Sequence, residues 1–196
     1  MLSKTPYQLH SVPPSFFELA VFQPTRSLGP EGCTVAFEDG RTLGYGNLVW
    51  ATKGHARWLT CAGHALAGVH SVRSQADADR VIAELPSVES VVVIGCDFGL
   101  EADAVLTKRR KWVTVIEAQD PVLARVTGMV LWRFYEAEHR THGGDISLAT
   151  AASCIVGDDR ATGVRLADGS LLLADMVIVG IGIVPAVEPL LAAAQR

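Results

Sequence analysis

The fold of this chain is decided by residues 91–117, VVVIGCDFGLEADAVLTKRRKWVTVIE. The stretch opens with a short β-branched apolar run that ends at Gly95, as expected of a strand buried on both faces. A helical segment and a second apolar strand follow, and this strand ends in Glu117, twenty-two residues after Gly95. A strand, a glycine turn, a helix and a strand ending in an acid form the layout of a dinucleotide-binding βαβ unit. The order predicts an α/β, Rossmann-like domain with a parallel sheet.

The glycine turn departs from the G-x-G-x-x-G pattern of such units. A register that starts at Gly95 requires glycine at positions 97 and 100, where this chain has Asp97 and Leu100, and Gly99 comes one residue early. A carboxylate at position 97 would face the pyrophosphate of a dinucleotide, and each such pair at ~4 Å costs roughly 4 kcal/mol at an effective dielectric near 20. We also expect Asp97 to act as the N-cap of the helix, accepting the amide hydrogens that a phosphate would otherwise use.

Composition excludes several classes of function. The net charge of -4 and a pI near 5.8 give no basic footprint for nucleic acid. The four cysteines are scattered and the six histidines have no ligand spacing, so we expect no metal and no redox disulfide. No catalytic triad or carboxylate pair supports hydrolysis. The N-terminus lacks an apolar signal region, and the longest apolar run, 176–187, is interrupted by Pro185. We therefore expect a cytoplasmic protein that does not enter a membrane.

An internal repeat relates two parts of the chain. Residues 34–54, TVAFEDGRTLGYGNLVWATKG, align without gaps with residues 163–183, GVRLADGSLLLADMVIVGIGI. Each copy predicts a strand, an Asp-Gly hairpin turn of type I′, a second strand and a buried third strand. The alignment sets Lys53 against Gly182, at a strand end where a nucleotide would approach the backbone. The repeat is either a chance match of two hairpins or the trace of two homologous nucleotide-binding domains.

Helices and strands alternate in the rest of the chain, which favours a parallel sheet. The long helix that we expect at 121–142 carries Val122, Val126, Val130 and Phe134 at helical intervals, which predicts a buried face. The other expected elements are helices at 74–85 and 100–110, the latter ending in the basic run 108–111, a linker at 86–87, and strands at 145–148 and 151–156.

Several segments in order resemble the FAD-dependent ferredoxin reductases, the group that contains putidaredoxin and rhodocoxin reductases and is similar to apoptosis-inducing factor. The segments that resemble its NADH-binding domain are VVVIGCDFGLEADAV, VTVIEAQDPVLARV, FYEAEHRTHGGDI, GVRLADG and VIVGIGIVP. Those that resemble the end of its FAD-binding domain are PPSFFE, FEDGRTLGYGNLVWATKG and LAGVHSVRSQADA. The resemblance implies a partial FAD-binding tail at 1–86 and a Rossmann-like NAD(P)H-binding domain with a β-meander at 87–196. The complete family enzyme passes hydride from NADH to FAD and then single electrons to a ferredoxin.

The resemblance also implies where the cofactors would lie. The expected cofactor-binding residues are Ala51, Thr52, Lys53, Gly95, Asp97, Gly99, Glu101, Glu117, Gly180 and Gly182. Lys53 stands where the family has the glycine of Ala-Thr-Gly, and the family's N-terminal FAD motif and C-terminal domain have no counterpart in these 196 residues. Another chain could supply the FAD half. The alternative function is a noncatalytic, truncated nucleotide-binding remnant.

Glu101 and Glu117 have further expected properties. The resemblance places Glu101 near the nicotinamide end of the cleft, while its position in the sequence is equally that of an acid in the first turn of a helix, where a negative charge is stabilising. Glu117 should accept both ribose hydroxyls of NADH. It should disfavour the 2′-phosphate of NADPH, because Ala118 and Gln119 offer no compensating arginine.

Overall fold

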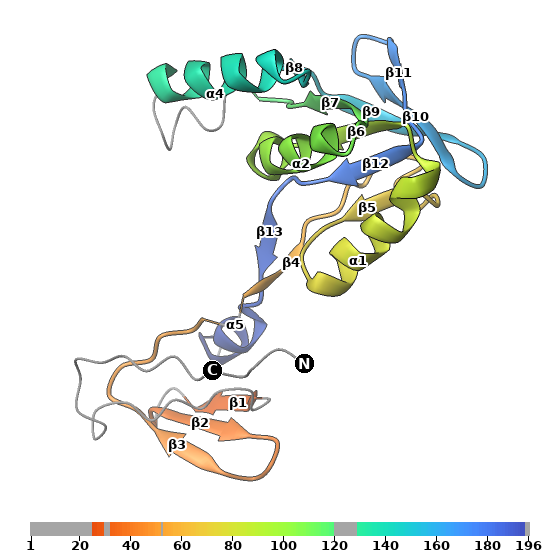
Figure 1. Cartoon of the computed structure of the whole chain (residues 1–196). Helices are drawn as coiled ribbons and strands as arrows, with labels where there is room; N and C mark the ends of the chain where they lie inside the picture. The colour runs from red at the N-terminus through yellow and green to blue at the C-terminus, as the bar shows by residue number, and fades with distance from the viewer. Residues whose placement is uncertain (1–24, 30–31, 52, 120–128, 195–196) are drawn as a thin grey trace. The chain divides into compact units, whose positions relative to one another are not determined.

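The computed structural model of the chain describes residues 25–29, 32–51, 53–119 and 129–194 (Figure 1). It divides into two compact units, one of Met1–Thr52 with Ala186–Arg196 and one of Lys53–Pro185. This division reflects contacts within each unit and does not test which cofactor either part binds, so the functional boundary at residues 86 and 87 stays a prediction.

The larger unit is built on a five-stranded sheet in the order β5-β12-β6-β7-β8. Every neighbouring pair in this sheet is parallel, which confirms the expected α/β, Rossmann-like class. The strands are β5 (Val69–Ser71), β6 (Ser90–Ile94), β7 (Trp112–Ile116), β8 (Asp145–Ser147) and β12 (Met176–Val179).

Helices cover one face of this sheet and an antiparallel meander covers the other (Figure 1). The alternation along β6 shows why, since Val91 and Val93 pack with the helices whereas Val92 and Ile94 pack with the meander. Burial on both faces accounts for the uninterrupted apolar run that the sequence shows at this strand. The helices are α1 (Gln75–Glu84), the 3₁₀ helix η2 (Leu85–Ser87), α2 (Cys96–Lys108) and α4 (Met129–Thr141), and the meander is β9 (Ala152–Gly157), β10 (Ala161–Leu166) and β11 (Leu171–Leu173).

The smaller unit contains the strands β1 (Thr25–Gly29), β2 (Thr34–Phe37) and β3 (Thr42–Gly44) and the helix α5 (Glu188–Ala194). Leu28, Val35 and Phe37 form its buried core, against which Leu190 of α5 packs. The indole Nε1 of Trp50 donates to the carbonyl oxygen of Ala186 at 2.8 Å, which links the segment after β3 to the segment that leads into α5.

The internal repeat is confirmed in its two hairpins. Val35 pairs with Leu43 across β2 and β3, and Val164 pairs with Leu172 across β10 and β11, so the two hairpins share the register that the gapless alignment requires. The expected type I′ turn was wrong, because only the glycine of each Asp-Gly pair has a positive φ, 88° at Gly40 and 89° at Gly169. Each loop has three residues closed by one left-handed glycine, the usual alternative to the two-residue turn.

The third strand of the repeat forms in one copy only. In the second copy it is β12, which lies between β5 and β6. In the first copy, the described residues from 45 to 51 form no strand, and Val49 is 88% exposed. A buried strand forms only where neighbouring strands can pair with its backbone N–H and C=O groups. In the described part of the smaller unit, no strand pairs with residues 45–51.

The long helix expected at 121–142 is described only from Met129, and Val122 and Val126 lie outside the described residues. Val130 and Phe134 are 88% and 60% exposed, so the prediction that they belong to a buried face was wrong. The helix contacts α2 and β8 through its C-terminal half, where His139 and Arg140 lie, and its apolar stripe remains on the surface. Among the described helices, none has the length and apolarity that crossing a bilayer requires.

Candidate functional site

The turn between β6 and α2 is held closed by backbone contacts that only glycine permits. Gly95 has φ 106° and ψ 129°, and its amide donates to the carbonyl oxygen of Ile116 at 2.8 Å. A Cβ at Gly95 would lie 2.7 Å from the carbonyl carbon of Gly180 and closer still to its oxygen. The ends of β6, β7 and β12 therefore meet at one point on the carboxyl edge of the sheet, which is where open α/β sheets bind ligands.

Helix α2 begins at Cys96, four residues before the expected start at Leu100. The expectation that Asp97 is the N-cap was wrong, since Gly95 is the N-cap and Asp97 is the second helical residue. The side chain of Asp97 lies outside the described part of the chain. The early start follows from the shortened turn, because the chain enters the helix directly after the one glycine that reverses its direction.

Gly99 provides the close packing of helix against sheet. It is buried in α2, and a Cβ there would lie 2.8 Å from Cγ1 of Val115 on β7. The last glycine of a G-x-G-x-x-G turn has this packing role. Gly99 fills it one residue early because the turn is one residue shorter.

Glu117 faces the first turn of α2 and accepts a hydrogen bond from a backbone amide to which a phosphate could otherwise bind. Its Oε2 accepts the backbone N–H of Cys96 at 3.0 Å, and its Oε1 accepts the backbone N–H of Gln119 at 2.9 Å. The amides at the start of a helix have no partner within the helix, so an anion is stabilised there. Glu117, which directly follows β7, thus caps the first turn of the helix. Each of its oxygens keeps a further lone pair that can accept a ribose hydroxyl.

Two hollows flank this turn and share Gly180 and Gly182. The Glu117 hollow has a volume of about 320 Å³ and is lined by Cys96, Glu117, Ala118, Gln119, Gly180, Ile181 and Gly182. The Arg73 hollow has a volume of about 130 Å³ and is lined by Ala56, Val72, Arg73, Phe98, Val179, Gly180, Gly182 and Ile183. Gly180 is confined by Phe98, whose Cβ would lie 3.1 Å from an added Cβ, whereas Gly182 has φ 94° and open space around it.

The structure brings together Gly95, Glu117, Gly180 and Gly182 from the sequence-predicted set, whereas Gly99 packs α2 against Val115 and Val93 of the sheet. Glu101 lies in the second turn of α2, not in the first, because the helix starts early; it is exposed and lines neither hollow. Its role near the nicotinamide stays a prediction. The sequence did not single out Arg73, which lines the smaller hollow and lies directly before the capping serine of α1, Ser74.

The residues that the resemblance assigns to the FAD side are Ala51, Thr52 and Lys53. Ala51 and Lys53 are exposed, and Thr52 lies outside the described residues. Lys53 has φ 65°, a left-handed conformation that favours glycine. Its repeat partner Gly182 has φ 94°, so both copies keep the same backbone form, and Lys53 carries a Cβ and a charge where its partner has neither.

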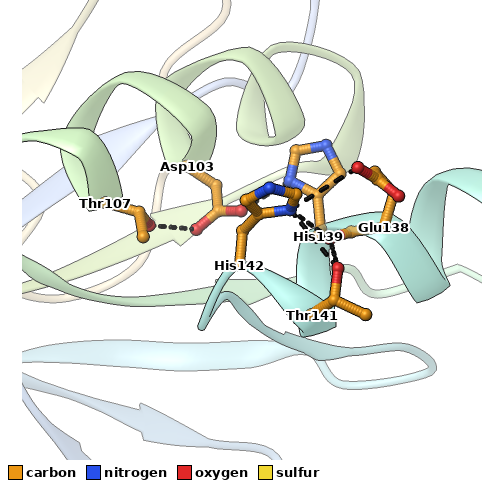
Figure 2. A network of polar contacts seen from close by, with 6 residues as sticks. All are labelled: Asp103, Thr107, Glu138, His139, Thr141 and His142. Atoms are coloured by element: carbon orange, nitrogen blue, oxygen red, sulfur yellow. Dashed lines mark hydrogen bonds and ion pairs between the residues drawn. The ribbon is translucent and has the colours of Figure 1, made fainter.

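A separate polar network joins α4 to α2 (Figure 2). The carboxylate of Asp103 is 2% exposed, lies 2.6 Å from Nδ1 of His139 and accepts the hydroxyl of Thr107 at 3.1 Å. His142 and Glu138 flank a hollow of about 410 Å³ beside it. Since a buried carboxylate is costly unless paired, we interpret this network as the attachment of α4. Among the described residues, no cluster of three or more His, Cys, Asp or Glu side chains could hold a metal ion.

Comparison with known proteins agrees with this geometry. The model of the pyridine nucleotide-disulphide oxidoreductase family matches residues 22–195. The chain belongs to this family. It is 53% identical to a ferredoxin–NAD(P)(+) reductase of Sphingomonas sp. over 164 residues, which are 83% of this chain and 40% of that protein. It is 49% identical over 179 residues to the ferredoxin reductase subunit of a 5,5'-dehydrodivanillate O-demethylase of Sphingobium sp., covering 90% of this chain and 43% of that protein.

Solved structures give the same result. A ferredoxin reductase of Rhodopseudomonas palustris superposes with a TM-score of 0.77 at 32% identity, covering 88% of this chain and 43% of that one. The putidaredoxin reductase in a covalent complex with putidaredoxin superposes with a TM-score of 0.73 at 33% identity, covering 87% and 43%. The chain thus spans less than half the length of these relatives, and the resemblance to ferredoxin reductases found in the sequence is confirmed.

Proposed function

We propose that this chain is the pyridine-nucleotide-binding part of a ferredoxin reductase and binds NADH at the carboxyl edge of its parallel sheet. The observation that carries the proposal is Glu117, fixed by two backbone amides at the end of β7 and lining a hollow beside the α2 turn. An acid held there can accept the ribose hydroxyls of an adenosine, and the glycines at 95, 180 and 182 let a ligand approach the backbone. The residues of the Glu117 hollow therefore fit the adenosine half of NADH.

In the complete enzyme, hydride passes from NADH to FAD and electrons continue to a ferredoxin, and this redox chemistry belongs to the cofactors. The residues described here would bind and orient the nicotinamide nucleotide. They do not fit FAD, because Lys53 replaces the small residue of the repeat at a left-handed position. Residues other than these 196, in a longer polypeptide or in a second one, would complete the FAD site. The names of the two relatives of highest identity quoted above favour a reductase over a noncatalytic remnant.

The test of the nucleotide site is competition between NADH and NADPH, followed by the change in NADH fluorescence on binding. The wild type should prefer NADH, because the Glu117 carboxylate would repel a 2′-phosphate. Glu117→Ala should lose about tenfold in NADH affinity, the worth of a hydrogen bond to a charged group, and should lose the preference. Asp145→Ala is the matched control, an exposed acid at the start of the adjacent strand β8 that lines neither hollow. Equal affinity for both nucleotides in the wild type, or an unchanged ratio in Glu117→Ala, would refute the assignment.

A reductase assay with FAD and a flavin-binding half separates the reductase from the noncatalytic alternative. The chain mixed with FAD alone should not support NADH-driven reduction of a dye or of a ferredoxin, because its described residues do not complete a flavin site. Adding a flavin-binding half from one of the relatives would then restore activity if the proposal is right, and would leave the chain inert if it is a remnant.

A further inference from the structure

A further hollow, the α2–α4 hollow, lies between the C-terminal ends of these two helices. It has a volume of about 410 Å³ and is lined by residues of α2 from Asp103 to Lys108 and by the end of α4 with the turn after it. Figure 2 shows the polar contacts along its walls. Helix α2 begins at Cys96, which lines the Glu117 hollow, and ends at Lys108, which lines this one. At about 1.5 Å per residue the two ends of the helix are about 18 Å apart, so the α2–α4 hollow is separate from the nucleotide site.

The two carboxylates of the α2–α4 hollow already have partners. Asp103 is 2% exposed, and its Oδ2 lies 2.6 Å from Nδ1 of His139. Oε1 of Glu138 lies 3.6 Å from Nδ1 of His142. Lys108 also lines the hollow, and within the described part of the chain its ammonium group makes no ion pair or hydrogen bond. One positive charge is therefore left for a ligand, whereas a second negative charge on that ligand would lie near two carboxylates without a cation of its own.

The wall beside Lys108 is apolar. A lysine in the last turn of a helix also stabilises the helix dipole, so the charge of Lys108 alone does not define a site. Carbon atoms make up most of the wall, to which Ala104 and Thr107 contribute and which Lys108 can extend with its alkyl stem. The volume of about 410 Å³ lies toward the lower end of the ~300–1,000 Å³ range of ligand pockets and well above the ~150 Å³ that accommodates benzene. The hollow therefore suits one aromatic ring that carries a single negative charge.

We propose that the α2–α4 hollow binds a small aromatic carboxylate. The ring lies between the two helices, and the carboxylate accepts a hydrogen bond from Nζ of Lys108. Asp103 and His139 act as positioning residues, because their contact holds α4 beside α2 and so sets the width of the hollow. The site shares no lining residue with the Glu117 hollow, so this inference goes beyond the proposed nucleotide binding and does not depend on it.

The test is a titration of the full chain, labelled with ¹⁵N, with benzoate, with its neutral counterpart benzamide and with acetate, followed by the amide signals in NMR spectra. Benzoate should shift the amides at the ends of α2 and α4 with a Kd on the order of 1 mM, as expected of a ligand of this size. Benzamide should bind about fivefold more weakly, because it lacks the ion pair. Acetate, which has the charge without the ring, should cause no saturable shift there.

Three variants locate the ligand. Lys108→Gln should weaken benzoate about fivefold and leave benzamide unchanged, so that the preference for the acid disappears. Arg109→Gln is the matched control, an exposed cation directly after α2 that does not line the hollow, and it should change neither affinity. Ala104→Leu places a larger side chain in the hollow and should weaken both ligands. In the wild type, raising the salt concentration should bring benzoate close to the affinity of benzamide, because salt screens an exposed ion pair.

The inference is overturned if the wild type shows no saturable shift with benzoate, or binds benzamide equally well. An equal loss of benzoate affinity in Lys108→Gln and Arg109→Gln would show only a general effect of surface charge, which also contradicts it. Shifts centred on Glu117 and Gln119 that NADH abolishes would place benzoate in the nucleotide site and refute the assignment to the α2–α4 hollow. If Ala104→Leu does not fold, Lys108→Gln and the salt titration decide the question without it.

Discussion

Replacing Gly95 with alanine tests whether the ends of the three strands meet as described. Gly95 has φ 106° and ψ 129°, a region that is essentially restricted to glycine, and placing another residue there costs about 1–3 kcal/mol. The added Cβ would also lie 2.7 Å from the carbonyl carbon of Gly180, and forcing an extra carbon into packed structure costs a further ~1–3 kcal/mol. Alanine restricts the unfolded chain, which returns roughly 0.4–1 kcal/mol. The expected net loss in the free energy of unfolding is about 3 kcal/mol.

Gly169→Ala is the matched control for this substitution. Gly169 lies in the same compact unit with φ 89°, but no atom lies within 4 Å of an added Cβ, so alanine there meets only the backbone cost, about 1 kcal/mol. Urea unfolding of both variants, followed by circular dichroism, measures the difference. If Gly95→Ala is destabilised no more than Gly169→Ala, at an unchanged m-value, then Gly95 does not pack against Gly180. The described meeting of the strand ends between the two hollows would then be incorrect.

Four further predictions concern charge, cofactors and backbone strain. Asp97→Gly should tighten NADH binding by at least tenfold, about 1.4 kcal/mol by calorimetry; tight NADH binding by the wild type would contradict the charge argument. The chain should purify without flavin absorbance, and one equivalent of FAD retained through gel filtration would show the opposite. Lys53→Gly should raise the unfolding midpoint, since it removes a left-handed lysine at φ 65° worth up to ~1 kcal/mol net; a lower midpoint would mean that the lysine side chain stabilises the fold. The backbone amides of Ser90 and Glu89 lower the pKa of Asp175 below its ordinary 3.8, so this carboxylate stabilises the fold at neutral pH and ceases to do so as the pH falls through its lowered pKa. Asp175→Asn should therefore be less stable than the wild type at pH 7 and should approach it in acid, and a difference that does not vary with pH would be inconsistent with this role.

Local sequence was sufficient for the βαβ unit and for both hairpins. The β-branched runs that end at Ile94 and Ile116 predicted buried parallel strands, because residues buried on both faces leave no polar alternation. The Asp-Gly dipeptides predicted both hairpins, and the gapless repeat predicted their shared register. The helix expected at 74–85 is α1, and the capping box that Ser74 and Asp77 form at its start is local by nature.

Contacts between distant residues decided the rest. Glu117 caps α2 across 21 positions of sequence, so no local rule for N-caps could choose it over Asp97. The first copy of the repeat leaves its third strand unformed because strand formation depends on neighbours that the copy itself does not encode. Val130 and Phe134 have a helical spacing that is the same whether the face is buried or exposed. Arg73 lies beside the smaller hollow and donates from Nε to the carbonyl oxygen of Gly54, nineteen residues earlier, which no local pattern around Arg73 predicts.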